Sequence, residues 1–295
     1  MSTSRFVGQT MVGSRPSSAA ARPNRSADLR LLRSELRLVF GRRRNLALMA
    51  VLCSFPVLIG TAVRVSAPSG GDGPPFLSQV TDNGLFLVFT SLTVLLPFFL
   101  PLAVSVASGE AIAGEANIGT LRNLLVVPVS RTRLLVVKYI STVVFASVCT
   151  AAVAVVGVVV GLVLFPHGDA TLLSGTTISY EAALWRALLV ALYVTLMLAG
   201  VCGIGLFIST LTEVPIGAMA ATAVLTIVSQ IADSIPQIHV VHPYLFSHPW
   251  FNFGDLLRSP ISWHGLQMGL VTQVAYLAVF LPLAWARLQT KDITA

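Results

Sequence analysis

Charged residues are scarce in this sequence, and most of the chain is apolar. Only 11% of the 295 residues are charged, whereas 55% are hydrophobic, and the mean hydropathy is +0.82. A soluble domain carries about 25% charged residues, so this composition excludes an ordinary soluble protein. It predicts an all-α membrane protein that crosses the bilayer several times.

Cysteine is also rare. Cys53, Cys149 and Cys202 all lie within apolar runs, their number is odd, and no Cys-x-x-Cys pair occurs. We interpret them as small buried side chains. They give no information about the redox compartment.

Acidic residues are missing from the start of the chain, which is rich in Ser, Arg and Ala and has no acid before Asp28. Residues 1–26 are therefore predicted to be a disordered basic tail, and residues 27–295 the folded domain. An organelle transit peptide has a similar composition, but no clear amphipathic helix precedes Ser26. An early apolar run, which a secretory signal requires, is also missing. Attraction to anionic lipid accounts for the basic start without nucleic acid.

Six apolar stretches predict membrane spans, because a bilayer requires about 20 residues per helix. They are residues 45–63, 84–108, 134–165, 187–211, 215–231 and 266–285. Pro97 and Pro101 predict a kink in the second span. Residues 26–44 combine apolar residues at helical spacing with arginines on the other side, which predicts an amphipathic interfacial helix capped by Ser26.

Glycines within the spans predict close packing between helices. Gly157 and Gly161 form a GxxxG pattern in the third span, and Gly200, Gly203 and Gly205 lie in the fourth. Such patterns let two helix backbones approach each other.

The basic residues are distributed unevenly between the two sides of the predicted membrane. If the N-terminus is cytoplasmic, 16 of the 19 basic residues lie on that side, and only Arg64, Arg186 and Arg258 lie on the other. Cytoplasmic loops carry an excess of Lys and Arg. Six spans return the chain to its starting side, so both termini are predicted to be cytoplasmic.

The main polar interruption between the spans is EANIGTLRNLLVVPVSRTRLLVVK, residues 115–138. Residues 118–127 have one apolar face, with Arg122 on the other side. Pro128 cannot continue a helix, and Ser130 can cap the next one. The pattern predicts a short amphipathic helix on the membrane surface between two spans.

This loop resembles the signature loop of the type-2 permeases of ABC transporters. The matching positions are Glu115, Gly119, Thr120, Leu121, Arg122, Leu124, Leu125, Pro128, Ser130, Arg131 and Lys138. Asn117 departs from the family, where many members have a second charged residue. In that family the loop is a coupling helix that docks on a separate ATP-binding subunit. The resemblance therefore implies a coupling role for nine of these positions. They are Glu115, Gly119, Thr120, Leu121, Arg122, Leu124, Leu125, Pro128 and Arg131.

The resemblance implies the permease subunit of an ATP-driven exporter, paired with a second permease copy or homologue in a bacterial cell membrane. Its cargo would be a drug, a peptide or a lipid-like molecule. In the family the second and fifth spans line the transport path, where the polar residues of this chain are Thr90, Thr93, Thr226, Ser229 and Gln230.

ATP and Mg would be bound by the partner subunit. Residues 114–120 read Gly-x-x-x-x-Gly-Thr, but the lysine of a phosphate-binding loop is missing. The chain is therefore predicted to have neither a nucleotide site nor catalytic residues.

His239, His242, His248 and Asp255 lie between the fifth and sixth spans and are possible metal ligands. Their spacing is irregular, and prolines and aromatic residues are interleaved with them. We therefore favour short helices at the outer interface and predict no metal. Residues 242–258 also resemble the outer segment of the permeases, which there forms short half-buried helices.

Two other classes stay open at this point. An ion-coupled secondary transporter predicts charges at the bilayer midplane and an internal repeat, and neither is visible. A polytopic membrane enzyme predicts an acid, base or metal cluster near the interface, for which the histidines are the one candidate.

Overall fold

The computed structural model describes residues 25–66, 80–81, 83–117, 130–166 and 168–290, and the structural statements below refer to these residues. Almost all of them are helical. The helices are α1 (Arg25–Gly41), α2 (Arg43–Ser66), α4 (Phe86–Leu95), α5 (Phe99–Asn117), α7 (Arg131–Leu164), α8 (Tyr180–Leu211), α9 (Pro215–Asp233) and α10 (Trp263–Thr290). Three 3-10 helices, η1 (Pro236–Ile238), η2 (His242–Tyr244) and η3 (His248–Leu257), join α9 to α10.

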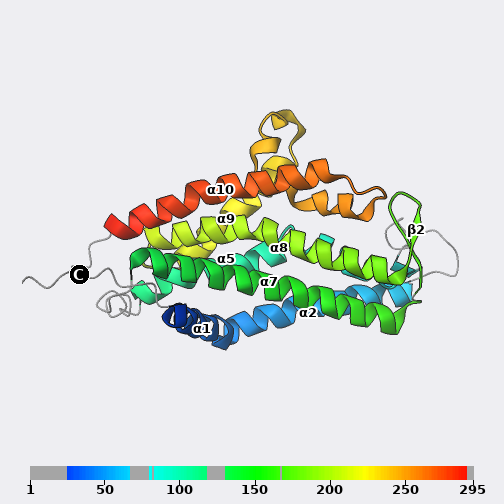
Figure 1. The fold of residues 1–295 in the computed structure, drawn as a ribbon, viewed down its shortest axis with the longest axis horizontal. Helices are drawn as coiled ribbons and strands as arrows, with labels where there is room; N and C mark the ends of the chain where they lie inside the picture. Colours follow the sequence, from blue (N-terminus) through cyan, green and yellow to red (C-terminus); the bar gives the residue numbers. More distant parts are fainter. Residues whose placement is uncertain (1–24, 67–79, 82, 118–129, 167, 291–295) are drawn as a thin grey trace, which may run out of the picture.

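The long helices lie side by side along the long axis of the molecule (Figure 1). The start of α7 and the end of α10 share one end of the bundle, beside α1. At the other end lies a short antiparallel hairpin of β1 (Ala170–Thr171) and β2 (Thr177–Ile178). The end of α10 therefore lies at the same end of the bundle as α1 (Figure 1).

The structure confirms an all-α membrane protein. Five helices, α2, α7, α8, α9 and α10, are long and apolar enough to cross a membrane, and the bent pair α4 and α5 can form a sixth span. Many large apolar side chains are exposed on the outside of the bundle; Val163 is 77% exposed and Val271 is 64% exposed. A soluble protein rarely exposes such an apolar surface, whereas a bilayer covers it.

The predicted kink in the second span is a complete break. The axes of α4 and α5 differ in direction by 57°. Pro97 lies in the turn between them, and Pro101 lies in the first turn of α5, where a helix has no intrahelical use for the missing N–H. The prolines therefore end one helix and begin the next.

Polar residues extend two helices beyond the apolar run, so that α8 begins earlier than predicted and α7 begins where Ser130 predicts. α8 begins at Tyr180 rather than at residue 187, and the side chain of Ser179 accepts a hydrogen bond from the backbone N–H of Ala182. α7 begins at Arg131, capped by Ser130, whose side chain accepts from the N–H of Arg133. The predicted cap at Ser130 is confirmed.

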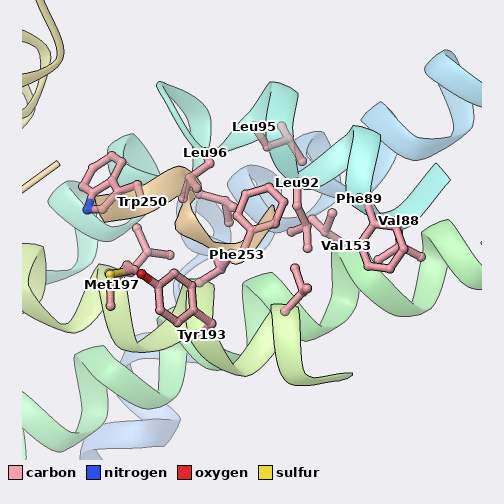
Figure 2. Close-up of a cluster of buried hydrophobic side chains, with 14 of the residues drawn as sticks. Val88, Phe89, Leu92, Leu95, Leu96, Val153, Tyr193, Met197, Trp250 and Phe253 are labelled. Atoms are coloured by element: carbon pink, nitrogen blue, oxygen red, sulfur yellow. The ribbon is translucent and has the colours of Figure 1, made fainter. Parts of the chain in front are cut away.

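The core lies where α4, α7, α8 and η3 meet, at the hairpin half of the bundle. Figure 2 shows Leu92, Leu96, Met197, Trp250 and Phe253 in one cluster, and Trp250 and Met197 are fully buried. The hydroxyl of Tyr193 in this cluster donates to the backbone oxygen of Pro249 at 2.9 Å. η3 is thus part of the protein interior, whereas η1 and η2 contain no buried residues, and the predicted short helices are confirmed.

Glycines set the closest approach between helices, as the sequence predicts. Gly84 and Gly161 face each other, so that a Cβ on either would overlap the backbone carbonyl of the other, and Gly157 packs against the backbone of Val88. In the same way, a Cβ on Gly109 of α5 would lie 2.7 Å from the backbone nitrogen of Met219 in α9. Glycine is required at these contacts because backbone atoms leave no room for a side chain.

The Gly161→Ala substitution should destabilise the protein, because its methyl group would push α7 away from the chain at Gly84. Overpacking of this kind costs about 1–3 kcal/mol. Thermal unfolding of the purified protein in detergent measures the effect. The control is Gly168→Ala, since a Cβ at Gly168 would meet no atom within 4 Å. Equal melting temperatures for the two variants would contradict the packing described here.

Candidate functional site

Six charged side chains gather at the end of the bundle where α5 ends and α7 begins. This charge cluster consists of Glu35, Arg42, Arg44, Glu110, Glu115 and Lys138. They come from α1, α2, α5, α7 and the junction between α1 and α2. Four helices and the junction between α1 and α2 are therefore joined by ionic contacts.

Lys138 is the centre of the charge cluster. Only 1% of this residue is exposed. Its ammonium group donates to Glu115 Oε1 at 2.5 Å and to the two carboxylate oxygens of Glu35 at 3.2 and 3.4 Å. One lysine on α7 thereby joins the C-terminal end of α5 to the middle of α1.

Glu110 holds the other half of the charge cluster. Its two carboxylate oxygens pair separately with Arg42 and Arg44. Glu110 precedes Glu115 by five residues in α5. Both carboxylates therefore form their ion pairs near the C-terminal end of this helix. The cluster contains three cations and three carboxylates; Lys138, Glu35 and Glu115 are largely buried, whereas Arg42 and Arg44 keep partial contact with solvent.

The first turn of α7 is fixed to the end of α10. The guanidinium group of Arg131 donates to the backbone oxygens of Leu288 and Gln289, each at 2.6 Å. The indole N–H of Trp285 donates to the hydroxyl of Thr132 at 2.8 Å. Since the last carbonyls of a helix have no intrahelical partner, Arg131 satisfies groups that α10 leaves open.

Both ends of the predicted coupling loop are therefore anchored. Glu115 holds the preceding helix through Lys138, and Arg131 holds the following helix through α10. The other predicted coupling residues fall within 118–129 and lie outside the described residues; they are Gly119, Thr120, Leu121, Arg122, Leu124, Leu125 and Pro128.

The structure separates the polar residues predicted for the transport path into two groups. Thr90 and Thr93 of α4 line an apolar cavity of about 380 Å³ whose other wall includes Phe251 and Phe253 of η3. Both hydroxyls donate to backbone oxygens one turn earlier in α4. The cavity thus offers an apolar lining with two small polar groups.

The second group lies on α9 and faces the interior of the chain's own helix bundle. Thr226 and Ser229 are buried, and the hydroxyl of Ser229 shares a hydrogen bond of 2.6 Å with Ser247. They continue a stripe of small residues, Ala218 and Thr222, that packs on α5 and α8. Gln230 is half-buried, and its side-chain nitrogen lacks a hydrogen-bond partner.

The histidine segment forms a different group from the one considered in the sequence. His242 and His248 come together with Asp233, and their ligand atoms lie within 4.8 Å of one another. His239 and Asp255 are not in this group. The sequence did not group Asp233 with the histidines because Asp233 is the last residue of α9 and η1 separates it from His242.

Glu35 is the charged residue that the sequence analysis missed. It lies in α1 among Arg30, Arg33 and Arg37, which are exposed as predicted. A signal was present, however. Glu35 follows Leu32 by three residues and precedes Val39 by four, so it lies on the apolar side of a helix whose other charges point away.

These features define a polytopic α-helical membrane protein with a charge cluster at one end and a packed aromatic segment toward the other. Comparison with protein families assigns it more closely. The model of the ABC-2 family transporter proteins matches residues 41–229. The chain therefore belongs to the ABC-2 family and is a membrane permease subunit of an ABC transporter. No curated protein matches the chain.

Replacing Lys138 with methionine should strongly destabilise the protein. The substitution leaves Glu35 and Glu115 facing each other without a buried cation, and breaking a buried ion pair costs about 3–5 kcal/mol. Unfolding in mixed detergent micelles measures the loss. The control is Arg37→Met, because Arg37 is exposed on α1.

A compensating variant tests whether charge is the cause. Adding Glu35→Gln and Glu115→Gln to Lys138→Met removes all three charges and should restore part of the lost stability. If the single and triple variants unfold alike, the effect comes from the shape of the lysine side chain and not from its charge.

Proposed function

We propose that this permease is the transport subunit of an ATP-driven exporter, and that residues 115–131 receive movement from its ATP-binding partner. Membership of the ABC-2 family implies such a partner. The family assignment also favours this function over an ion-coupled transporter or a membrane enzyme. The coupling role is supported above all by the burial of Lys138 between carboxylates of α1 and α5.

The anchors explain how the loop can transmit force. A segment whose ends are free absorbs a push through its own rearrangement, whereas a segment fixed at both ends passes the push to its neighbours. Here a displacement of the loop is carried from Glu115 of α5 through Lys138 into α7, and from Arg131 of α7 into α10. In the sequence, Arg122 is the residue best suited to a charge-assisted contact with the partner.

The basic residues support a cytoplasmic position for this end of the molecule. The charge cluster contains Glu115 at one end of the loop, and Arg131 at its other end holds the end of α10; the basic tail precedes α1 in the sequence. Arg186 and Arg258 lie toward the opposite end, where Arg186 donates to the backbone oxygens of Leu256 and Arg258. In this proposal both termini are cytoplasmic, and the bent pair α4 and α5 is one of six spans.

The surface of α9 supports a dimeric transport path. α9 contacts its own protomer through a narrow stripe, and large apolar side chains on its other sides are exposed, among them Ile216 at 74% and Val224 at 57%. A second permease copy is the proposed neighbour of this face. Of the polar residues predicted for the path of a drug, peptide or lipid-like cargo, Thr90, Thr93 and Gln230 are the ones we propose, whereas Thr226 and Ser229 face the interior of their own chain.

Cysteine labelling of intact cells should place the two ends of the bundle on opposite sides of the membrane. In a chain without its three native cysteines, a single cysteine at Asp169 or Gln237 should react with a membrane-impermeant maleimide. A cysteine at Thr120 should react only after the cells are opened. Reaction of the Thr120 position from outside would reverse the proposed topology.

A photo-crosslinking residue at position 121 should capture an ATP-binding cassette protein in native membranes, because the coupling loop is its proposed docking site. Mass spectrometry identifies the captured protein. The same residue at position 173, which is exposed near the hairpin, should not capture it. Capture from both positions, or from position 173 alone, would refute the docking site.

The Arg122→Ala substitution should weaken this capture. A hydrogen bond to a charged group contributes about 1.5–3 kcal/mol, which corresponds to roughly tenfold to hundredfold in affinity. The matched control is Arg258→Ala, which removes an exposed arginine from the opposite end. If the two variants bind the partner equally well, Arg122 does not make the proposed contact.

A further inference from the structure

Asp233, His242 and His248 form a compact polar group that the coupling proposal does not use. Asp233 is the last residue of α9, His242 begins η2 and His248 begins η3. The three ligand atoms lie within 4.8 Å of one another. The segment that carries the histidines stands out from the side of the bundle next to α10 and is drawn in gold in Figure 1.

The orientation of His242 is suited to binding a cation. Its Nε2 lies 3.1 Å from the backbone oxygen of Ile235. Because that oxygen only accepts, Nε2 carries the hydrogen, and the neutral ring keeps its lone pair on Nδ1. Metal-binding histidines are commonly held in this way, with the second ring nitrogen donating to a backbone carbonyl.

The lone pair of His242 faces a carboxylate without a hydrogen bond between them. Nδ1 of His242 and Oδ1 of Asp233 are 3.9 Å apart, which is too far for a hydrogen bond. Two electron-rich atoms at this distance repel each other unless a positive charge lies between them. The position between Nδ1 and Oδ1 therefore favours a cation.

His248 supplies the third ligand. Its Nδ1 donates to Asp233 Oδ1 at 2.6 Å. In a tetrahedral zinc site, ligand bonds of about 2.0–2.2 Å place the ligand atoms roughly 3.3 Å apart. The distance from Asp233 Oδ1 to His248 Nδ1 would increase from 2.6 Å, and the distance from Asp233 Oδ1 to His242 Nδ1 would decrease from 3.9 Å. His248 can make this adjustment because its side chain is 45% exposed, and a zinc ion would displace its Nδ1 proton to water.

We propose that Asp233, His242 and His248 bind one zinc ion, with water in the fourth position. Two imidazoles and one carboxylate are a donor set that zinc accepts. The ion would tie the end of α9 to η2 and η3. This proposal replaces the sequence-based expectation that the segment holds no metal, because the sequence did not reveal that Asp233 joins the two histidines.

Zinc titration of the purified full-length chain, with any affinity tag removed, tests the site. A competing zinc-binding dye should report one saturable zinc ion per chain, and zinc should raise the melting temperature. The His242→Ala and Asp233→Asn variants should weaken binding by at least about tenfold and abolish the shift in melting temperature. The matched control is His239→Ala, which removes a nearby exposed histidine outside the group.

A rescue variant keeps the test valid if an alanine variant fails to fold. His242→Cys provides a thiolate, which is also a zinc ligand, and should retain zinc binding. The proposal is overturned if the unmodified chain binds no zinc saturably. It is equally overturned if His242→Ala and His239→Ala bind zinc alike, since the ion would then occupy another place.

Discussion

The buried ammonium group of Lys138 is the constraint on which the loop end of this structure depends. An isolated charge in an apolar interior is costly, and it becomes acceptable only when carboxylates surround it. Glu35 and Glu115 meet this requirement from two different helices. The position of α1 against α7 and the position of the end of α5 are therefore fixed together by one side chain.

This constraint links the proposed function to the fold. The charge cluster fixes the segment before residues 118–129, and Arg131 fixes the segment after them. Both anchors lie at the ends of the coupling loop, and residues 118–129 between them are the proposed contact with the partner. We infer that specificity for the partner and transmission of its movement are carried by different residues, the first by the loop and the second by its anchors.

The sequence predicted the parts of the fold that depend on local patterns. The apolar runs predicted the spans, Ser130 predicted the start of α7, and Pro97 predicted a bend between α4 and α5. Each of these signals depends only on residues that are close together in the chain. The charge cluster could not be predicted in the same way. Glu35 and Lys138 are about a hundred residues apart, and their pairing depends on how α1 packs against α7. The same reason explains why Asp233 was not grouped with the histidines.

The two ends of the bundle are held by different interactions, and this difference suggests how movement passes between them. The loop end is held by paired charges, whereas the hairpin end is held by packed aromatic side chains and by donors such as Tyr193 and Gln273 on backbone oxygens. α7 has 34 residues and α8 has 32, so each is roughly 50 Å long, whereas a bilayer core is about 30 Å thick. Both helices are continuous and reach from one end to the other. If the loop end moves as proposed, α7 and α8 carry the displacement toward the segment between α9 and α10 and toward the cavity lined by Thr90 and Thr93. The break between α4 and α5 is then a joint at which the angle between these two helices can change.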